Sequence, residues 1–380
     1  MISLAGGFPN PSTFPLTALS FTLRTGETVQ LSPQELAAGL QYGPSVGMPA
    51  LQTELQTIMR REHDGKNSRG TTWGICVGTG SQDVLDKAFW ATLNEDDAML
   101  IDSPCYSGTL SSLNGIGCRR VEVPTDADGL ITSELERILQ GWKGPERRPR
   151  ILYTVPSGGN PTGATLSLER RHELLRIARK YDLLVFEDDA YFYLQFEQRL
   201  PSLWSLDEDS RVVRFDSLSK IFSAGLRLGW MTGHTAIVDA VQISMQAAAL
   251  QASGLTQVIV ASTLRNWGQA GWEKHIADTS AFYKARRDFM ANLLSKNLTG
   301  LCRWSVPKAG MFVWLELVGR DTTLLMPQLV EQNVLMVPGA GFSPTGATSS
   351  PHFRLTYSVS TEEQMQTAIE RLAKFLRDTQ

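Results

Sequence analysis

The hydrophobic positions along the chain follow two different periods that alternate. Short runs in which nearly every position is apolar, such as 183–186, are separated by longer stretches in which apolar residues recur every third or fourth position, such as 168–181. The short runs are typical of strands buried on both faces, and the longer pattern is typical of amphipathic helices. Strands that alternate with helices predict an α/β fold with a mainly parallel sheet covered by helices. The predicted strands are 73–77, 98–101, 151–155, 183–186 and 212–215.

The first part of the chain has a different pattern. Residues 1–45 are rich in Gly, Pro, Ser and Thr and show little periodicity before Leu36, which predicts an arm followed by a short helix. From Met48 onward the apolar residues recur at helical spacing and predict an amphipathic helix that ends near the loop 65–70.

The last third of the chain predicts more helices and a second, smaller α/β domain. A long helix at 272–298 follows two others, and we expect it to link the domains. In the segment 352–359 apolar and polar residues alternate, which places Arg354 on the polar face of a half-buried strand. The other predicted elements are helices at 237–250, 255–267 and 324–331, strands at 312–317 and 334–337, and a closing helix capped by Ser360 and Glu363.

Composition narrows the class of protein. With 380 residues, 42% hydrophobic residues and 20% charged residues, the chain is expected to form two globular domains. A formal charge of -3 argues against nucleic acid or an anionic membrane as a partner, and no apolar run approaches the roughly 20 residues of a membrane span. Four cysteines without a CxxC pair and five histidines without an HxxxH pair argue against disulfides and metal sites. Residues 1–9 resemble neither a signal nor a transit peptide, so we expect a cytoplasmic protein, or one of the mitochondrial matrix if a presequence has been removed.

A lysine in the segment after strand 212–215 is the first candidate for chemistry. Lys220 follows Ser217 and Ser219 and precedes Arg227, and these hydroxyls and this cation suit a phosphate beside a reactive amine. A neutral lysine amine forms a Schiff base with an aldehyde, and the phosphorylated aldehyde cofactor pyridoxal 5′-phosphate combines both groups. The alternative is a solvated loop lysine, which this short motif alone does not exclude.

Polar side chains follow strand after strand at the carboxyl ends, where open parallel sheets bind ligands. Asp188 is a candidate partner for a protonated ring nitrogen, although it is also placed to cap a helix. Asn160 and Tyr191 are candidate donors to a ring oxygen, although Asn-Pro is also a turn former. Tyr106 is a candidate for stacking on a ring, or a core residue. With Lys220, these side chains predict a site at one edge of the sheet.

The segment GTGSQ at 78–82 predicts a second group of phosphate ligands. It joins a predicted strand to a predicted helix, so the amides of Ser81 and Gln82 would lie at a helix N-terminus, which binds anions. The segment also looks like the start of a dinucleotide-binding fingerprint. Asp83 stands where that fingerprint has its third glycine, so nicotinamide binding is disfavoured.

An ordered set of motifs resembles one enzyme family. The chain is similar to fold type I, pyridoxal-phosphate-dependent class I/II aminotransferases, and most of all to the kynurenine/2-aminoadipate aminotransferases. The resemblance covers almost the whole chain. It differs where this chain has Ser157-Gly158-Gly159 in place of NGN and Ala190 in place of a proline. The segments are ISLAGGFPNPSTFP, LQYGPSVG, VGTGSQD, DSPCYSGTL, YTVPSGGNPTG, FEDDAYFYLQF, DSLSKIFSAGLRLG, PKAGMFVWLE, VLMVPGAGF and FRLTYS.

The resemblance implies a fold and a set of residue roles. The fold is α/β, with a mainly parallel seven-stranded-type sheet, a smaller α/β domain and an N-terminal arm. Its implied parts are 1–42 (arm and part of the small domain), 43–270 (large cofactor-binding domain) and 271–380 (linking helix and small domain). The implied cofactor ligands are Ser81, Gln82, Tyr106, Asn160, Asp188, Tyr191, Ser217, Ser219, Lys220, Arg227 and Tyr42, with Lys220, Asp188 and Tyr106 catalytic; the implied substrate ligands are Arg354, Asn160, Gly7 and Tyr42.

The resemblance also implies an activity and an assembly. The expected reaction moves the amino group of an aromatic amino acid, kynurenine or 2-aminoadipate to 2-oxoglutarate. Tyr42 resembles a tyrosine that reaches the phosphate of a neighbouring subunit, so a homodimer with shared active sites is expected. Relatives usually have further chain before the segment that matches Met1, in some with an arginine for a distal carboxylate. The alternatives are a pyridoxal-phosphate-dependent lyase and, less in keeping with the Gly/Pro-rich arm, the ligand domain of a transcription regulator.

Overall fold

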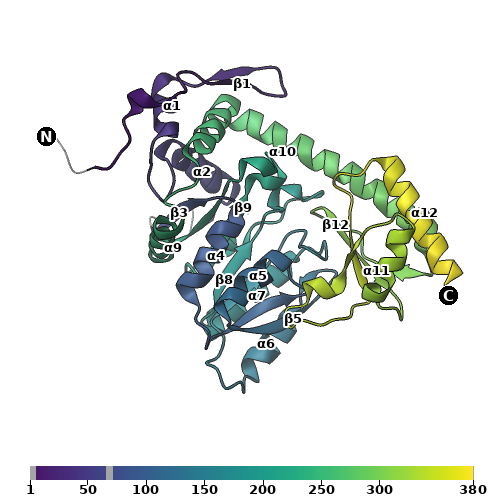
Figure 1. Cartoon of the computed structure of the whole chain (residues 1–380). Coiled ribbons are helices and arrows are strands. Elements are labelled where there is room, and N and C mark those ends of the chain that lie inside the picture. The colour runs from purple at the N-terminus through teal and green to yellow at the C-terminus, as the bar shows by residue number, and fades with distance from the viewer. Residues whose placement is uncertain (1–5, 66–71, 380) are drawn as a thin grey trace. The chain divides into compact units, whose positions relative to one another are not determined.

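The computed structural model describes residues 6–65 and 72–379, and Figure 1 shows its elements. The chain forms two compact units. The first comprises Met1–Thr92, Glu208–Ser210 and Arg214–His275; the second comprises Leu93–Asp207, Arg211–Val213 and Ile276–Gln380. The three-part domain division inferred from the sequence is a different grouping of the chain, and it stays a prediction.

The strands of each unit confirm the predicted α/β class. In the second unit the strand order is β8–β7–β4–β5–β6, where β8, β7, β4 and β5 form parallel pairs and the two-residue β6 turns back on β5. In the first unit β10 lies antiparallel between β3 and β9. The bounds are β3 Trp73–Gly78, β4 Ala98–Ser103, β5 Arg119–Asp126, β6 Gly129–Leu130, β7 Ile151–Thr154, β8 Leu184–Asp188, β9 Val212–Ser217 and β10 Gly229–His234.

The antiparallel β10 was not predicted, and it positions part of the candidate site. Gly229, its first residue, pairs with Ser217 at the end of β9 and with Gly78 at the end of β3. The loop after β9 and the turn after β3 therefore begin side by side. Helices α4 (Ser81–Thr92) and α9 (Thr235–Ala248) belong to the same unit.

The N-terminal segment contains more structure than the predicted arm. Strands β1 (Ser20–Thr22) and β2 (Thr28–Gln30) form a hairpin, and Leu19 and Phe21 beside it pack against a buried cluster of Leu31, Met48 and Val258. The short segments lacked a visible period because each strand has only three residues. The two predicted helices are confirmed as α1 (Pro33–Leu40) and α2 (Pro49–Glu62). Of the loop predicted after α2, 66–70 lie outside the described residues.

Most predicted helices of the second half are confirmed. The helix α10 (Gly254–Leu298) is interrupted at Gly268, whose φ of 56° suits glycine, and this break separates the two helices predicted at 255–267 and 272–298. Helix α7 (Leu168–Tyr181) has the predicted bounds. The remaining helices of the second unit are α5 (Ser107–Ile116), α6 (Thr132–Gln140), α8 (Leu203–Leu206), α11 (Thr322–Glu331) and α12 (Glu362–Asp378).

The C-terminal part of the second unit is an antiparallel sheet with helices, as predicted for the smaller α/β region. Its strand order is β11–β12–β14–β13. Trp314 of β12 pairs with Arg354 of β14, so both side chains point from the same face of the sheet. The bounds are β11 Cys302–Arg303, β12 Phe312–Leu317, β13 Val337–Pro338 and β14 His352–Thr356.

Two details of this region correct the sequence analysis. The strand predicted at 334–337 is wrong except for its last residue, because the Val334 amide still bonds to the Leu329 carbonyl at the end of α11. The predicted cap of α12 is one residue too early. Thr361 and Gln364 form the capping box, whereas Ser360 and Glu363 offered the same spacing.

All four cysteines are buried and free, as expected of structural thiols. Among the described residues, no helix is long and apolar enough to cross a membrane, and no group of three or more acidic, histidine or cysteine side chains is placed to hold a metal ion.

Candidate active site

The loop that carries Lys220 is closed at both ends by backbone hydrogen bonds. The Leu218 amide bonds to the Leu228 carbonyl at 3.1 Å, and Ser217 pairs with Gly229 where β9 and β10 meet. Within the loop the Ser217 hydroxyl accepts from the Ser219 amide at 3.2 Å, which begins a short 3₁₀ turn that ends at Lys220. The lysine is half-buried, and these backbone bonds hold the loop that carries it.

Arg227 lies across the two predicted phosphate-binding segments of the first unit. Its guanidinium donates to the Ser219 hydroxyl at 3.2 Å and to the Thr79 carbonyl at 3.5 Å. Its backbone is left-handed, with a φ of 50°. The loop after β9 and the turn after β3 are thus joined by a cation that stays exposed.

Glycines keep space open around this cation. A Cβ atom at Gly80, whose φ is 83°, would overlap the Arg227 guanidinium. A Cβ atom at Gly229 would overlap the Ser81 amide nitrogen. The helix α4 begins at Ser81, so its first amides need partners from outside the helix. The small residues, the cation, the hydroxyls and the helix N-terminus together form a site suited to a phosphate group.

Two other charged pairs of side chains lie on the elements that carry this site, and each is paired within the first unit. Asp83, in the first turn of α4, accepts from the Thr79 amide at 2.8 Å and forms an ion pair with Lys87. In β9, the fully buried Arg214 pairs with Asp216, with a shortest distance of 2.7 Å. Neither carboxylate therefore competes with a phosphate for Arg227, and the buried pair fixes the strand that leads to Lys220.

In the second unit, Asp188 lies at the end of β8 and is the last member of a hydrogen-bond chain. The Tyr153 hydroxyl donates to Asp188 Oδ2 at 2.7 Å, and the Thr109 hydroxyl lies 2.9 Å from the Tyr153 oxygen. All three side chains are buried. Tyr153 and Thr109 were not predicted as site residues, because a tyrosine inside the run ILYT has the pattern of a core residue.

Arg354, Asn160 and Tyr191 form a second group in the same unit. Arg354 Nη1 donates to Asn160 Oδ1 at 2.9 Å, and the Asn160 side chain also bonds to the Tyr191 hydroxyl. The guanidinium carbon lies 4.6 Å from the centre of the Phe312 ring and 5.0 Å from that of Phe342. Partial burial lowers the pKa of Arg354, whereas the nearby Tyr191 and Tyr106 oppose that shift; an arginine remains charged regardless.

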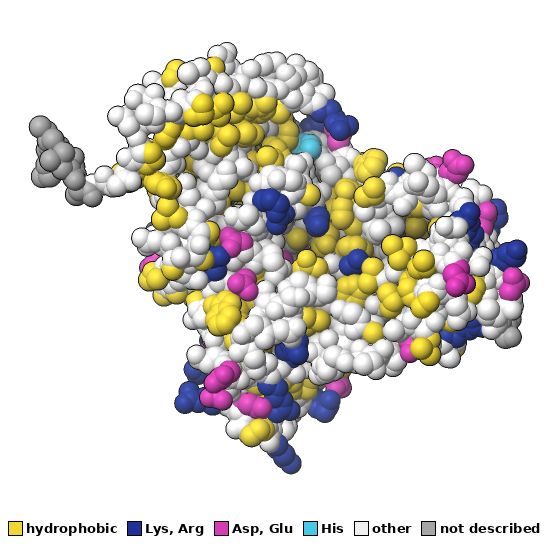
Figure 2. Space-filling model, in the orientation of Figure 1, with side chains coloured by type: hydrophobic (Ala, Val, Ile, Leu, Met, Phe, Trp, Pro, Cys, Tyr) yellow, Lys and Arg dark blue, Asp and Glu magenta, His cyan; other side chains and the backbone are white. Residues whose placement is uncertain are grey.

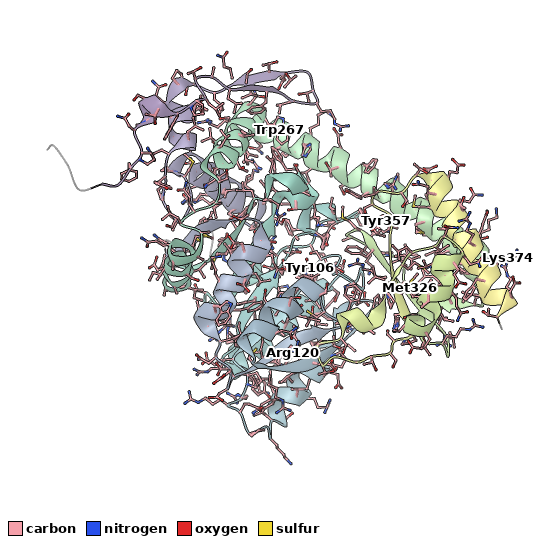
Figure 3. The ribbon with its side chains drawn as sticks, in the orientation of Figure 1. Tyr106, Arg120, Trp267, Met326, Tyr357 and Lys374 are labelled. Carbon is pink, nitrogen blue, oxygen red and sulfur yellow. The ribbon has the colours of Figure 1, made fainter. Side chains whose placement is uncertain are left out.

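Tyr106 is held at the start of α5, where Figure 3 labels it. A Cβ atom at Gly108 would overlap the Tyr106 ring, so this glycine gives the ring its place. Burial is the main cause that raises the pKa of Tyr191, and Asp188 and Tyr106 add to it. Tyr106, Asn160, Asp188, Tyr191 and Arg354 therefore influence one another within the second unit. Lys220 and the phosphate-type residues belong to the first unit.

The two remaining predicted residues, Gly7 and Tyr42, lie in the N-terminal part of the first unit. Tyr42 follows α1 and is 55% exposed. The Phe8 ring lies 6.3 Å from the Tyr42 ring, and Gln41 Nε2 donates to the Pro9 carbonyl at 2.9 Å. The arm is thus attached beside Tyr42, and nothing crowds Gly7.

Asp102, at the end of β4, is a buried carboxylate that the sequence analysis missed. Its Oδ2 accepts from the Thr154 hydroxyl and the Val155 amide, each at 3.0 Å, whereas its buried Oδ1 has no hydrogen-bond partner among the described residues. Burial raises the pKa of Asp102 to about 7, against the two hydrogen bonds that lower it. A carboxylate directly after an apolar run was the available signal.

Replacing Asp102 by asparagine should remove a pH dependence of stability. Between the unfolded pKa of about 4 and the folded pKa of about 7, the folded protein keeps a proton that the unfolded chain has lost, so stability falls as pH rises. At about 1.4 kcal/mol for each unit, the full loss is on the order of 4 kcal/mol at pH 8. Asparagine mimics the protonated form. Thermal unfolding should show equal stability of Asp102→Asn and the unmodified protein near pH 4, and a more stable variant at pH 8.

The control for this measurement is Asp239→Asn, which removes an exposed carboxylate from α9. It should leave the difference between pH 4 and pH 8 unchanged. An Asp102→Asn variant whose stability varies with pH like that of the unmodified protein would contradict a raised pKa at this position.

Comparisons with known proteins identify the family of this chain. The family model for aminotransferases of class I and II matches residues 30–372. The kynurenine/alpha-aminoadipate aminotransferase of Mus musculus, named as mitochondrial, is 38% identical over 393 residues, which cover all of this chain and 92% of the mouse protein. The kynurenine aminotransferase of Pyrococcus horikoshii, solved with PMP, has a TM-score of 0.85 at 29% identity and covers 99% of this chain and 90% of its own. LysN of Thermus thermophilus, an alpha-aminoadipate aminotransferase, has a TM-score of 0.80 at 30% identity. The match covers 90% of this chain and 84% of the LysN chain.

The chain belongs to the class I and II aminotransferases, which have the type I fold. It is a pyridoxal-phosphate-dependent transaminase that acts on an amino acid and a 2-oxo acid. The predicted family, fold class, enzyme class and cofactor are confirmed. The lyase and transcription-regulator alternatives receive no support from these relatives.

The residues present fit this cofactor. The Gly80 and Gly229 backbone, the α4 N-terminus and Arg227 suit its phosphate. Asp188, Asn160 and Tyr191 offer an acceptor and donors of the kinds that a protonated ring nitrogen and a ring oxygen require. Which residues contact the cofactor was predicted from the sequence, and it stays a prediction.

Proposed function

We propose that this enzyme moves the amino group of an aromatic amino acid, kynurenine or 2-aminoadipate to 2-oxoglutarate. The names of the mouse, Pyrococcus and Thermus relatives support these donors, because they include kynurenine and alpha-aminoadipate. The observation that carries the proposal for this chain is the surroundings of Arg354. Among the described residues, this half-buried cation has an amide and two aromatic rings as neighbours and no carboxylate.

Arg354 thus has the properties of a site for a substrate α-carboxylate. The rings of Phe312 and Phe342 keep water from part of the guanidinium and orient it by cation–π contact. Its bond to Asn160 uses one nitrogen, so a planar carboxylate can still approach the fork of donors. A carboxylate arriving there would regain by ion pairing what the arginine lost by partial burial.

In the second unit, the proposed cofactor ligands act on the ring. When bound, pyridoxal phosphate supplies an aldehyde that takes up the amino group and a ring that withdraws electrons. Asp188 keeps the ring nitrogen protonated, and Asn160 and Tyr191 donate to the ring oxygen. Tyr106 covers one ring face. Asn160 Oδ1 accepts from Arg354, so its amide nitrogen is the group that points to an oxygen acceptor, and the arginine fixes this orientation.

In the first unit, the proposed roles are phosphate binding and proton transfer. Ser81, Gln82, Ser217, Ser219 and Arg227 bind the phosphate. With the cofactor bound, Lys220 Nζ would hold it between turnovers and would act as the base that takes the proton from the substrate α-carbon. A lysine does this as a neutral amine, which nearby cations and partial burial favour.

Selection of the donor side chain is proposed to depend on the N-terminal arm. Phe8 and Tyr42 supply aromatic surface, and the region around Leu255 adds apolar surface. An arm rich in glycine and proline adapts to either a ring or an extended dicarboxylate. Arg24, exposed in the turn between β1 and β2, is the first candidate for a cation that binds a distal carboxylate.

A homodimer that shares its active sites is also proposed. Large hydrophobic side chains of the first unit are exposed, and Figure 2 shows hydrophobic side chains gathered over the N-terminal segments. Monomers rarely expose such groups together unless they bind a partner. Tyr42 would then reach the cofactor phosphate of the other subunit. The exposed residues are Phe8, Leu16, Tyr42, Trp90, Ile243 and Leu250. The cellular compartment, cytoplasm or mitochondrial matrix, stays a prediction.

A donor panel with 2-oxoglutarate as acceptor tests the proposed function. Kynurenine, other aromatic amino acids and 2-aminoadipate should all react. Arg354→Lys should lower kcat/KM for every donor about ten- to a hundredfold, because a charged hydrogen bond contributes about 1.5–3 kcal/mol and lysine cannot form a bidentate pair. Decarboxylated analogues such as kynuramine should be poor donors for the unmodified enzyme and should lose little in the variant.

The matched control is Arg176→Lys, an exposed ion-paired arginine on α7 that should leave the panel unchanged. Equal use of kynurenine and kynuramine would contradict a carboxylate site at Arg354. A large preference for 2-aminoadipate over every aromatic donor would show that a distal cation dominates, and the Arg24→Ala variant would then be measured.

A further inference from the structure

The hydrogen-bond chain that ends at Asp188 has a fixed direction. An ionised carboxylate only accepts, so the Tyr153 hydroxyl must donate its single hydrogen to Asp188 Oδ2, at 2.7 Å. The Tyr153 oxygen can then only accept from Thr109, at 2.9 Å. Thr109 therefore donates to the Tyr153 oxygen, while the Tyr153 hydrogen points to Asp188.

The chain stays intact at neutral pH. Burial raises the pKa of Tyr153 well above its ordinary value, and the charge of Asp188 adds to this effect, so the phenol keeps its proton. Thr109 and Tyr153 are both fully buried, which keeps water from replacing either bond. Each member lies on a different element, namely α5, β7 and β8. The three elements are thereby held together at the carboxylate.

We propose that Tyr153 and Thr109 are positioning residues that orient the Asp188 carboxylate and set how strongly it attracts the proton of the cofactor ring nitrogen. This inference rests on the proposed role of Asp188. A donor to Oδ2 stabilises the negative charge of Asp188 and leaves the proton on the ring nitrogen. Without that donor, the proton is shared toward Asp188 and the ring withdraws electrons less strongly. Thr109 acts one step further away, three residues after Tyr106 on the same helix.

The test compares ring-nitrogen protonation in holoenzymes loaded with pyridoxal phosphate labelled with ¹⁵N in the ring. In Tyr153→Phe, the ¹⁵N signal should move toward the unprotonated position, kcat should fall about tenfold with KM nearly unchanged, and the isotope effect of an α-deuterated donor should rise. Thr109→Val should change each quantity in the same direction and by less, because it weakens the second bond of the chain.

The matched control is Tyr357→Phe. Tyr357, labelled in Figure 3, is as buried as Tyr153, and its hydroxyl donates to the Gly310 carbonyl at 2.8 Å. Its loss should reduce thermal stability to a similar extent without moving the ¹⁵N signal. This separates a general loss of packing from an effect on Asp188.

Two contrary results are distinguishable. If Asp188→Asn itself leaves the ¹⁵N signal unchanged, Asp188 is not the partner of the ring nitrogen, and both the proposed role and this inference are overturned. If Asp188→Asn moves the signal but Tyr153→Phe and Thr109→Val do not, only the inference is overturned. If either Tyr153→Phe or Thr109→Val fails to fold, the ¹⁵N signal of the other variant decides whether the inference holds.

Discussion

Replacing Lys220 by alanine should reduce transamination by several orders of magnitude. The variant loses the amine that holds the cofactor between turnovers and the base that moves the substrate proton, so two functions of one group are removed. The surrounding loop should persist, because it is closed by the Leu218–Leu228 backbone bond and the Ser217–Gly229 pair, neither of which uses the lysine side chain. The measurement is steady-state turnover together with the visible absorbance of the holoenzyme.

Chemical labelling gives this prediction a second readout. Borohydride reduction of the unmodified holoenzyme should fix the cofactor on the peptide that contains Lys220, and the Lys220→Ala variant should release its cofactor on denaturation. The control is Lys143→Ala, which removes a lysine that is not among the proposed site residues. Normal turnover by Lys220→Ala, or a label on another lysine, would place the reactive amine elsewhere.

Replacing Asp188 by alanine should weaken cofactor binding and slow proton removal from the substrate. Asp188 lies at the buried end of β8 and accepts a hydrogen bond from Tyr153. A charged hydrogen bond contributes about 1.5–3 kcal/mol, so cofactor affinity should fall about ten- to a hundredfold. The chemical step should slow further, because a neutral ring nitrogen withdraws electrons less well. Equilibrium binding of pyridoxal phosphate and the α-deuterium isotope effect measure the two losses separately.

Asp189, the next residue, provides the control. It is also a buried carboxylate, so Asp189→Ala causes a comparable change in charge and volume. If Asp188→Ala retains normal kinetics while Asp189→Ala does not, the roles of the two neighbours are reversed. If both variants retain normal kinetics, neither Asp188 nor Asp189 partners the ring nitrogen.

Much of the fold was predictable because its signals are local. The apolar runs of β4, β7, β8 and β9 and the helical period of α7 each span enough residues to show one period clearly. The hairpin of β1 and β2 was not predictable in this way, since three residues in each strand establish no alternation. The antiparallel β10 was missed because it starts with a glycine that follows the Lys220 loop, and its pairing with both β3 and β9 depends on distant residues. The cap of α12 was misplaced by one residue because two overlapping motifs fit the same spacing.

The sequence by itself determined the family, the enzyme class and the cofactor, because an ordered set of motifs resembles those of known aminotransferases, and the same resemblance proposed the candidate ligands. Tertiary structure decided what each candidate contacts. It placed Arg227 against Thr79 from a distant segment, left Arg354 with an amide and two rings as neighbours, and joined Thr109, Tyr153 and Asp188 into one hydrogen-bond chain. The hydrogen bonds among these contacts connect residues 35 to 194 positions apart, and a periodic pattern carries no information about them. Burial is likewise a property of the folded chain. The pKa of Asp102 is raised because folding excludes water from its carboxylate, and no local pattern in the sequence shows this.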